Sequence, residues 1–276
     1  MKRILLIATG GTIASKDNGN GLTPSIDVNI LLDYIPVIRQ MCHVTGISIM
    51  NIDSSNMNTA YIAAISECIM KNYNNYDGFV ITHGTDTCAY TAAALSYQLV
   101  NLSKPVILTG SQLPIDAEGT DAVINLTHAL IYSCEDISGV FLAFSDKLIK
   151  GTCAKKIKAK SFDAFESINY PVIATIQNST VIYNNYTSKA VRNTGKKFHI
   201  ETDMCTDIAV ISLFPGMDLR IFDYINPSCR GIIIEGYGIG GMPDNITEYI
   251  HRLTAGNICV VVTTQCLYEG VRLDIY

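Results

Sequence analysis

Four short polar turns carry the residue types of this chain that could do chemistry. They read Thr-Gly-Gly-Thr (9–12), Asp-Ser-Ser-Asn (53–56), His-Gly-Thr-Asp-Thr (83–87) and Gly-Ser-Gln (110–112). Such hydroxyl and carboxylate groups suit a site for a small polar molecule. A threonine hydroxyl on a glycine turn could also act as a nucleophile, provided that a base or an electrostatic partner activates it.

Each polar turn also has a less specific interpretation. The Gly-Gly-Thr turn lacks both the lysine of a phosphate loop and the Gly-x-Gly-x-x-Gly spacing, so nucleotide binding is disfavoured. Thr85, Asp86 and Thr87 could simply cap the helix that follows them, because Thr and Asp are favoured at helix starts. We expect His83, at the end of an apolar run, to make structural hydrogen bonds rather than to act in catalysis.

A lysine-rich segment offers the electrostatic partner. Six lysines lie between residues 147 and 160, and most of them are expected on a solvated face. A functional lysine would have to reach Asp86 and a threonine. Burial would lower its pKa and Asp86 would raise it, so the sequence leaves its protonation state open.

The elements around these turns follow a strand, turn, helix order. Apolar runs predict strands at 4–9, 45–52, 79–81, 105–109 and 139–144, and helical spacing predicts helices at 27–38, 59–72, 89–98 and 121–132. This alternation is typical of an α/β fold with a parallel sheet covered on both faces. In such a sheet the four turns would lie along one edge and could converge on one cleft.

A second α/β unit is expected after a break. We predict a larger N-terminal domain (1–180), a polar linker (181–205) that could hold one hairpin arm, and a smaller domain (206–276) with strands at 207–213, 231–235 and 258–263.

Composition narrows the function classes. The 276 residues carry a net charge of −5 with only 16% charged side chains, which argues against a nucleic-acid surface. No run approaches the ~20 apolar residues of a membrane helix. Nine scattered cysteines without a zinc-like spacing favour reduced thiols in a cytoplasmic protein and predict no metal site.

Longer motifs make the function more specific. TGGTIAS (9–15) and FVITHGTDTCAYTAAALS (79–96) occur in order, together with MNIDSSNM (50–57), LTGSQLP (108–114) and KSFDAFESINYP (160–171). Over essentially its whole length, the chain resembles the bacterial-type L-asparaginases of the cytosolic, type I-like branch. The resemblance implies hydrolysis of L-asparagine to L-aspartate and ammonia, often with weaker glutaminase activity. It also implies no metal or cofactor, and an active homodimer or homotetramer.

The resemblance also assigns roles to residues. Thr12 resembles the primary nucleophile and Thr85 the second catalytic threonine, with Asp86 binding the α-amino group of the substrate. The family's Gly-x-x-x-x-Lys pattern runs from Gly151 and selects Lys156 among its neighbours. The expected substrate-binding residues are Asp53, Ser54, Ser55 and Ser111, in addition to Thr85 and Asp86.

Three departures from the family pattern affect these expectations. The loop at 15–25 has Leu22 near the place where some members carry a helping tyrosine, although its glycines fit a flexible lid. Gly241 stands where other members have an asparagine that reaches the neighbouring subunit. The C-terminal domain, Rossmann-like in its strand pattern, is expected to be incomplete, because family members continue by several helices.

Two alternative functions therefore stay open. One is a glutamine-hydrolysing amidase subunit that feeds ammonia to a tRNA-amidating partner. The other is a catalytically weak binding or interaction protein, which the short C-terminus suggests.

Overall fold

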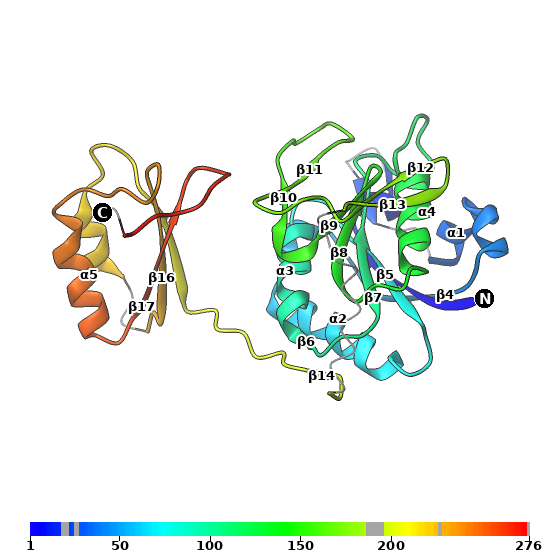
Figure 1. Cartoon of the computed structure of the whole chain (residues 1–276), viewed down its shortest axis with the longest axis horizontal. Helices are drawn as coiled ribbons and strands as arrows, with labels where there is room; N and C mark the ends of the chain where they lie inside the picture. Colours follow the sequence, from blue (N-terminus) through cyan, green and yellow to red (C-terminus); the bar gives the residue numbers. More distant parts are fainter. Residues whose placement is uncertain (18–21, 25–27, 186–195, 226–227, 275–276) are drawn as a thin grey trace. The chain divides into compact units, whose positions relative to one another are not determined.

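The chain divides into two units, Met1–Thr202 and Asp203–Tyr276 (Figure 1). The computed structural model describes residues 1–17, 22–24, 28–185, 196–225 and 228–274. Parts of the predicted lid (18–21 and 25) and of the predicted linker (186–195) lie outside the described residues.

An eight-stranded sheet forms the centre of the first unit, in the order β13-β12-β9-β8-β7-β5-β1-β4. Its five parallel strands are β1 (Lys2–Gly10), β4 (Cys42–Ile52), β5 (Gly78–Thr82), β7 (Pro105–Thr109) and β8 (Gly139–Phe144). The parallel sheet that the sequence predicted is thereby confirmed, with β7 and β8 at the expected bounds.

One edge of the sheet was not predicted. There β9 (Lys147–Lys150), β12 (Ala174–Gln177) and β13 (Thr180–Tyr183) continue it as antiparallel strands. Asn178 and Ser179 both have positive φ angles, 49° and 60°, as the two central residues of a type I′ hairpin turn require. The start of the predicted linker therefore belongs to the sheet, because β13 pairs with β12.

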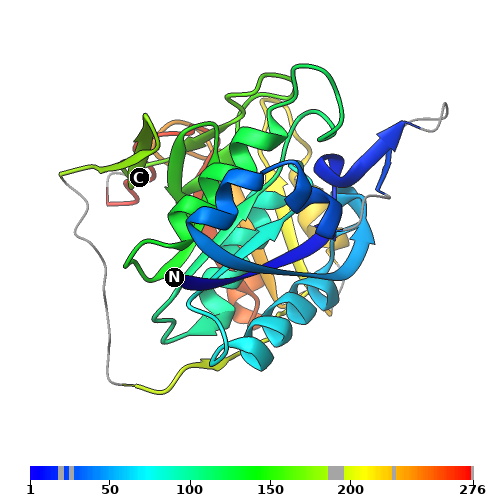
Figure 2. The ribbon, with the colours of Figure 1, turned by 90° about the vertical axis from the view of Figure 1, so that its right-hand side faces the viewer.

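Helices cover both faces of this sheet, and each face has its own core. Along β1, Ile4, Leu6 and Ala8 face one core, whereas Leu5 and Ile7 face the other. The first core includes residues of α1 (Val28–Asp33) and α4 (Ala122–Ser133), and the second includes residues of α2 (Thr59–Asn72) and α3 (Cys88–Gln98). Figure 2 shows α1 and α4 in front of the strands. Strands buried on both faces explain their nearly continuous apolar sequences.

The helix predicted at 27–38 is wrong in part. α1 ends at Asp33, and a separate 3-10 helix follows at Pro36–Gln40. Pro36 has no backbone N–H and disfavours helical geometry at the preceding residue. Ile35 accordingly has a φ of −127°, so the helix cannot pass through this point.

Smaller elements complete the first unit. Two-stranded sheets pair β2 (Ser15–Asp17) with β3 (Leu22–Pro24), β10 (Ala154–Lys156) with β11 (Phe165–Ser167), and β6 (Leu99–Val100) with β14 (His199–Ile200). The 3-10 helices are η1 (Thr12–Ala14), η3 (Ser54–Asn56) and η4 (Gly151–Cys153). Because β14 pairs with β6, the end of the predicted linker also packs on the first unit.

The second unit is a small parallel sheet with its own core. Its strands are β15 (Ile208–Ser212), β16 (Gly231–Gly236) and β17 (Cys259–Thr264), in that order, with η5 (Leu219–Tyr224) and α5 (Ile246–Ala255). Ile232 and Ile234 pack with Phe222, Ile246 and Leu253. Across the described residues of both units, no helix combines the length and the apolar composition that crossing a membrane requires.

Candidate active site

The first three polar turns pack against one another through backbone. Gly11 has a φ of +79°, and a Cβ atom there would lie 2.4 Å from the backbone nitrogen of Gly84. A Cβ atom on Gly84 would lie 2.5 Å from Oγ of Ser54. Only glycine permits contacts this close, so the two glycines bring the turns that follow β1, β4 and β5 together.

The fourth turn joins them from β7. A Cβ atom on Gly110 would lie 2.3 Å from the carbonyl oxygen of His83, and the His83 N–H donates to the carbonyl of Thr109 over 2.8 Å. The strands β7, β5, β1 and β4 are neighbours in that order. The predicted convergence of the four turns on one edge of the sheet is therefore confirmed.

Lys156 is the lysine that reaches this cluster. Its Nζ donates to Oγ1 of Thr85 over 2.8 Å and to a carboxylate oxygen of Asp86 over 2.7 Å. The Lys156 side chain is only 16% exposed, whereas that of Asp86 is 67% exposed. The lysine is thus largely enclosed, while the carboxylate remains open to solvent.

The chain around Lys156 explains its position. Gly151 lies so close to α3 that a Cβ atom would sit 2.9 Å from the carbonyl oxygen of Ala92. On the other side, Lys156 pairs with Phe165 between β10 and β11. Phe165 is buried, with its ring 4.9 Å from that of Phe144. The glycine of the Gly-x-x-x-x-Lys pattern therefore lets this strand approach α3.

The neighbouring lysines bind other groups or lie exposed to solvent. Lys147 and Lys158 both form ion pairs with Asp163, at 2.6 Å and 3.0 Å. Lys155 is exposed. The expectation that most of these lysines lie on a solvated face fits the exposed side chains of this segment.

The side chains of the third turn form hydrogen bonds other than those that cap a helix. Thr87 occupies the N-cap position of α3, but its side chain makes no capping hydrogen bond. Instead its hydroxyl donates to the backbone carbonyl of Ser54 over 2.7 Å. Thr85 and Asp86 both bind Lys156, so the capping interpretation of this turn is wrong.

Two further residues of the site were not predicted. Oγ1 of Thr85 donates to Oε1 of Gln112 over 3.3 Å, and Nε2 of Gln112 donates to the carbonyl of Ser161 over 3.0 Å. Asp121 accepts from the backbone N–H of Gln112 at 3.0 Å. Gln112 thus links Thr85 to the lysine-rich segment. The Gly-Ser-Gln turn was a signal for it, but nothing in the sequence pointed to Asp121.

Thr12 and Ser111 differ in accessibility. Thr12 is half-buried and begins η1, directly after the Gly11 that touches Gly84. Ser111 is only 1% exposed and donates its hydroxyl to the carbonyl of Leu113. The Ser111 hydroxyl therefore shapes its own turn in this structure.

The second turn presents a charged carboxylate. Asp53 accepts hydrogen bonds from the backbone N–H and the hydroxyl of Ser55, at 2.8 Å and 2.7 Å. These two bonds lower the pKa of Asp53 below its usual value, because they favour the ionised form. Asp53 and Ser55 are exposed, whereas Ser54 is buried under Gly84.

His83 has a structural role, as predicted. Its Nδ1 lies 2.7 Å from the carbonyl oxygen of Gly84 and its Nε2 lies 2.9 Å from Oγ1 of Thr91. Since the carbonyl can only accept, Nδ1 carries the proton and Nε2 accepts from Thr91. Burial lowers the pKa of His83 to about 4, so the ring is neutral at pH 7.

A pocket adjoins the Lys156–Asp86 pair. Its volume is about 410 Å³, in the range of small-molecule sites. Its lining residues are Asp86, Ala89, Tyr90, Ala93, Ala154, Lys155 and Lys156. Within the described ranges, no three His, Cys, Asp or Glu side chains gather in a way that could hold a metal ion.

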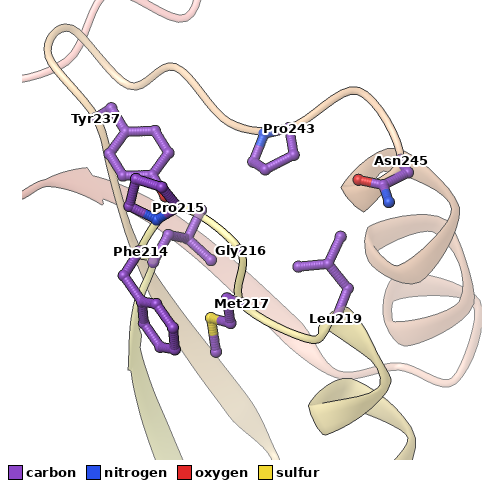
Figure 3. Close-up of a pocket in the computed structure, with 9 residues that line it drawn as sticks. Phe214, Pro215, Gly216, Met217, Leu219, Tyr237, Pro243 and Asn245 are labelled. Atoms are coloured by element: carbon purple, nitrogen blue, oxygen red, sulfur yellow. The ribbon is translucent and has the colours of Figure 1, made fainter.

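Another pocket lies in the second unit, beyond the carboxyl ends of β15 and β16. Figure 3 shows Phe214, Met217 and Leu219 around it, with Tyr237 and Asn245 at its sides. The lining includes no carboxylate, lysine or histidine. This pocket therefore suits proton transfer and nucleophilic chemistry less well than the turns of the first unit.

The chain is an α/β protein whose four polar turns converge at the carboxyl edge of a parallel sheet, and this edge is the candidate site. Residues 3–189 match the family model "Asparaginase, N-terminal", and residues 207–276 match "Glutaminase/Asparaginase C-terminal domain". The chain belongs to the asparaginase family of amidohydrolases.

Relatives from several organisms agree with this family. An L-asparaginase of Thermococcus kodakarensis is 36% identical, over 99% of this chain and 83% of its own. A solved structure of the thermostable L-asparaginase from that organism has a TM-score of 0.91 and 34% identity, over 99% of this chain and 83% of that chain. L-asparaginase I of Vibrio cholerae has a TM-score of 0.86 and 32% identity, over 96% of this chain and 82% of that chain.

Components of a second kind of enzyme are also similar. One of the subunits of the glutamyl-tRNA(Gln) amidotransferase of Methanosphaera stadtmanae is 33% identical, over 100% of this chain. This chain spans 65% of the length of that protein.

Proposed function

We propose that this protein is an L-asparaginase that hydrolyses L-asparagine to L-aspartate and ammonia through a threonine nucleophile. One observation carries the proposal: the enclosed Nζ of Lys156 binds Thr85 at 2.8 Å and Asp86 at 2.7 Å. A lysine, a threonine hydroxyl and a carboxylate are thereby joined at the sheet edge where the glycine turns meet. The names of the L-asparaginase relatives support the substrate.

In the first half-reaction, Oγ1 of Thr12 attacks the carbon of the substrate's side-chain amide. Backbone N–H groups of the turns would stabilise the oxyanion, and one well-placed donor contributes about 3 kcal/mol in comparable sites. The C–N bond then breaks, and the nitrogen leaves as ammonia with the proton lost by the threonine. A β-aspartyl ester on Thr12 remains.

In the second half-reaction, water attacks the ester and regenerates the Thr12 hydroxyl. Thr85 and Lys156 would orient this water. The hydrogen bonds support that role, since Thr85 donates to Gln112 and accepts from Lys156, so its hydroxyl has a defined direction. Aspartate then leaves the site.

Asp86 would bind the α-ammonium group of the substrate. Its side chain is 67% exposed although it already pairs with Lys156, so it can accept a second cation. Asp53, Ser54 and Ser55 would hold the α-carboxylate and α-amino groups, together with Ser111 on the turn that follows β7. The lowered pKa of Asp53 keeps it ionised and suited to an ammonium group.

We further propose a cytoplasmic homodimer or homotetramer that needs no cofactor. All nine cysteines are free thiols, as expected of a protein in a reducing compartment. One structural neighbour, from Campylobacter jejuni, is described as a probable cytoplasmic L-asparaginase; it has 26% identity and a TM-score of 0.81, over 99% of this chain and 86% of that chain.

The test is ammonia release from L-asparagine and from L-glutamine. We expect the protein to hydrolyse L-asparagine. The rate should fall by at least about 10³-fold in Thr12→Ala and in Thr85→Ala, because the nucleophile and its partner depend on each other in catalysis. Thr180→Ala is the control, since Thr180 is an exposed residue of β13. Near-full kcat in either site variant would refute the assignment, and inhibition by a metal chelator would refute the absence of a metal.

A glutaminase of the amidotransferase type is the second candidate. It is favoured by the 33% identity to the amidotransferase component of Methanosphaera stadtmanae. Higher kcat/KM for L-glutamine than for L-asparagine in the same assay would select this function over the first.

A further inference from the structure

The side-chain amide of Gln112 fits its surroundings in only one orientation. Its Nε2 donates to the backbone carbonyls of Ala159 and Ser161, over 3.3 Å and 3.0 Å. A carbonyl oxygen can only accept, so the NH₂ group must face these two carbonyls, and both of its N–H bonds are then used. The amide oxygen Oε1 is therefore left for the hydroxyl of Thr85, 3.3 Å away.

A buried carboxylate holds the backbone of Gln112. The Gln112 N–H donates to both carboxylate oxygens of Asp121, each over 3.0 Å. Asp121 is 5% exposed and also accepts from the backbone N–H of Leu113 at 3.1 Å and from Nδ2 of Asn125 at 3.0 Å. Asp121 occupies the N-cap position of α4 but makes no capping hydrogen bond. Its carboxylate thus fixes the turn that carries Gln112 rather than the start of the helix.

The segment that faces the amide is attached to the first unit by other contacts as well. Oγ of Ser145 donates to the carbonyl of Phe162 over 2.9 Å. Lys147 of β9 forms an ion pair with Asp163 at 2.6 Å. These contacts do not involve Gln112, so the two carbonyls that orient its amide are held in place independently of it.

The hydrogen bonds of Thr85 leave one position of its hydroxyl free. A hydroxyl has one O–H donor and two acceptor lone pairs. The O–H of Thr85 is directed to Oε1 of Gln112, which can only accept. One lone pair is directed to Nζ of Lys156, because an ammonium group can only donate. Toward a reacting molecule Thr85 can therefore act only as an acceptor, through its second lone pair.

We propose that Gln112 is a positioning residue for the second half-reaction, an inference that rests on the proposed function. By accepting the O–H of Thr85, it leaves a lone pair of Thr85 for the attacking water. The water then donates a hydrogen bond to Thr85 and keeps its own lone pair for the ester carbon on Thr12. Without Gln112, the Thr85 hydroxyl could donate to the water and occupy the lone pair that has to attack.

The first test replaces Gln112 by methionine, which keeps the length of the side chain and removes both the donor and the acceptor. Hydrolysis of L-asparagine is followed by chromatography of the aspartate formed. We expect kcat to fall about 10- to 100-fold, as for a misplaced reacting group. kcat/KM should change by less than about threefold, because it covers only the steps up to ammonia release. Mass spectrometry of acid-quenched samples should show an accumulated aspartyl ester.

Gln177→Met is the matched control, because Gln177 is an exposed residue of β12. Its kcat should stay within about twofold of the parent, and thermal melts check that both variants are folded. A near-parent kcat in Gln112→Met would overturn this inference and leave the proposed function in place. Equal losses of kcat and kcat/KM without the ester would do the same, since a structural defect slows both half-reactions. A parent chain that releases ammonia from neither amide would overturn the proposed function, and the role of Gln112 with it.

The second test, Gln112→Glu, concerns the orientation of the amide. An ionised carboxylate has no proton for the carbonyls of Ala159 and Ser161, which repel it and raise its pKa above the ordinary value. The protonated carboxyl again offers a donor to one carbonyl and an acceptor to Thr85. The ratio of the variant kcat to the parent kcat should therefore rise at least about fivefold between about pH 8 and about pH 5.

The charged groups near this amide are the same in the variant and the parent. Lys156 and Asp86 lie beyond Thr85, Asp121 binds the backbone N–H, and Asp163 lies in the facing segment with its lysine partners. The titration of these groups therefore cancels in the ratio. A ratio that does not change with pH would mean that the orientation of the amide is irrelevant, and the proposed role would be wrong.

Discussion

Replacement of Lys156 by methionine tests the candidate site most directly. Methionine keeps the apolar part of the side chain but removes the ammonium group that binds Thr85 and Asp86. Thr85 retains its bond to Gln112. The change therefore removes one charge from the site with little loss of packing.

The structure sets the expected size of two effects. Asp86 is 67% exposed, and an exposed ion pair contributes about 0–1 kcal/mol to folding. The free energy of unfolding should therefore change by less than about 1 kcal/mol. A group that positions or moves a proton in the transition state contributes about 10²–10⁴-fold, so kcat should fall by that factor.

The assay is ammonia release at saturating L-asparagine, with a thermal melt of the same preparation. Lys155→Met is the matched control, because Lys155 is the neighbouring residue and is exposed; its kcat should stay within about twofold of the parent, as expected for a surface change. Two results would refute the reasoning: a Lys156→Met enzyme with near-parent kcat, or a Lys155→Met enzyme that loses as much activity.

Three further predictions concern the turns. Gly11→Ala should lower the free energy of unfolding by more than about 2 kcal/mol in denaturant titrations, because the added Cβ atom would lie 2.4 Å from the backbone of Gly84. Gly119→Ala is the control, since Gly119 also has a positive φ (+72°) but has open space around it. This variant should lower the free energy of unfolding by only about 1 kcal/mol. Equal losses in the two variants would contradict the proposed close packing. Asp86→Asn should raise KM for L-asparagine at least about tenfold, as expected when an ammonium group loses its charged partner, and an unchanged KM in initial-rate assays would exclude substrate binding there. Burial lowers the pKa of His83 to about 4, below its value of about 6.5 in the unfolded chain. Between pH 6.5 and 4 the unfolded chain therefore binds a proton at His83 that the folded chain does not bind. The free energy of unfolding should fall by up to about 3 kcal/mol as the pH decreases through this range. His83→Gln should flatten this part of the stability curve, whereas an unchanged slope would mean that other groups cause it.

The regular elements of the first unit could be predicted because their signals are local. The strand at Pro105–Thr109 and the helix at Thr59–Asn72 have the predicted bounds, since composition and helical spacing decide both. The helix expected at 27–38 failed at Pro36, whose effect on the preceding residue outweighed the apolar pattern. The antiparallel edge was missed because β12 and β13 contain only four residues each, too few for a periodic signal.

The candidate site could be predicted only in part. The four turns could be predicted, because glycine, hydroxyl and carboxylate residues that follow an apolar run can be recognised from the local sequence alone. It also pointed to Lys156, but only through the resemblance to a family, since six lysines lie in the same segment. The capping interpretation of Thr85, Asp86 and Thr87 was equally consistent with the sequence and is wrong in the structure.

The sequence by itself determined the order of strands, turns and helices, and hence the edge at which the polar residues lie. Only the tertiary structure decided which groups bind one another there: Lys156 binds Thr85 and Asp86, and Gln112 binds Thr85. The physical reason is that these contacts join residues far apart in the chain. They depend on the approach of backbones at Gly11, Gly84 and Gly151, which no local pattern of residues encodes.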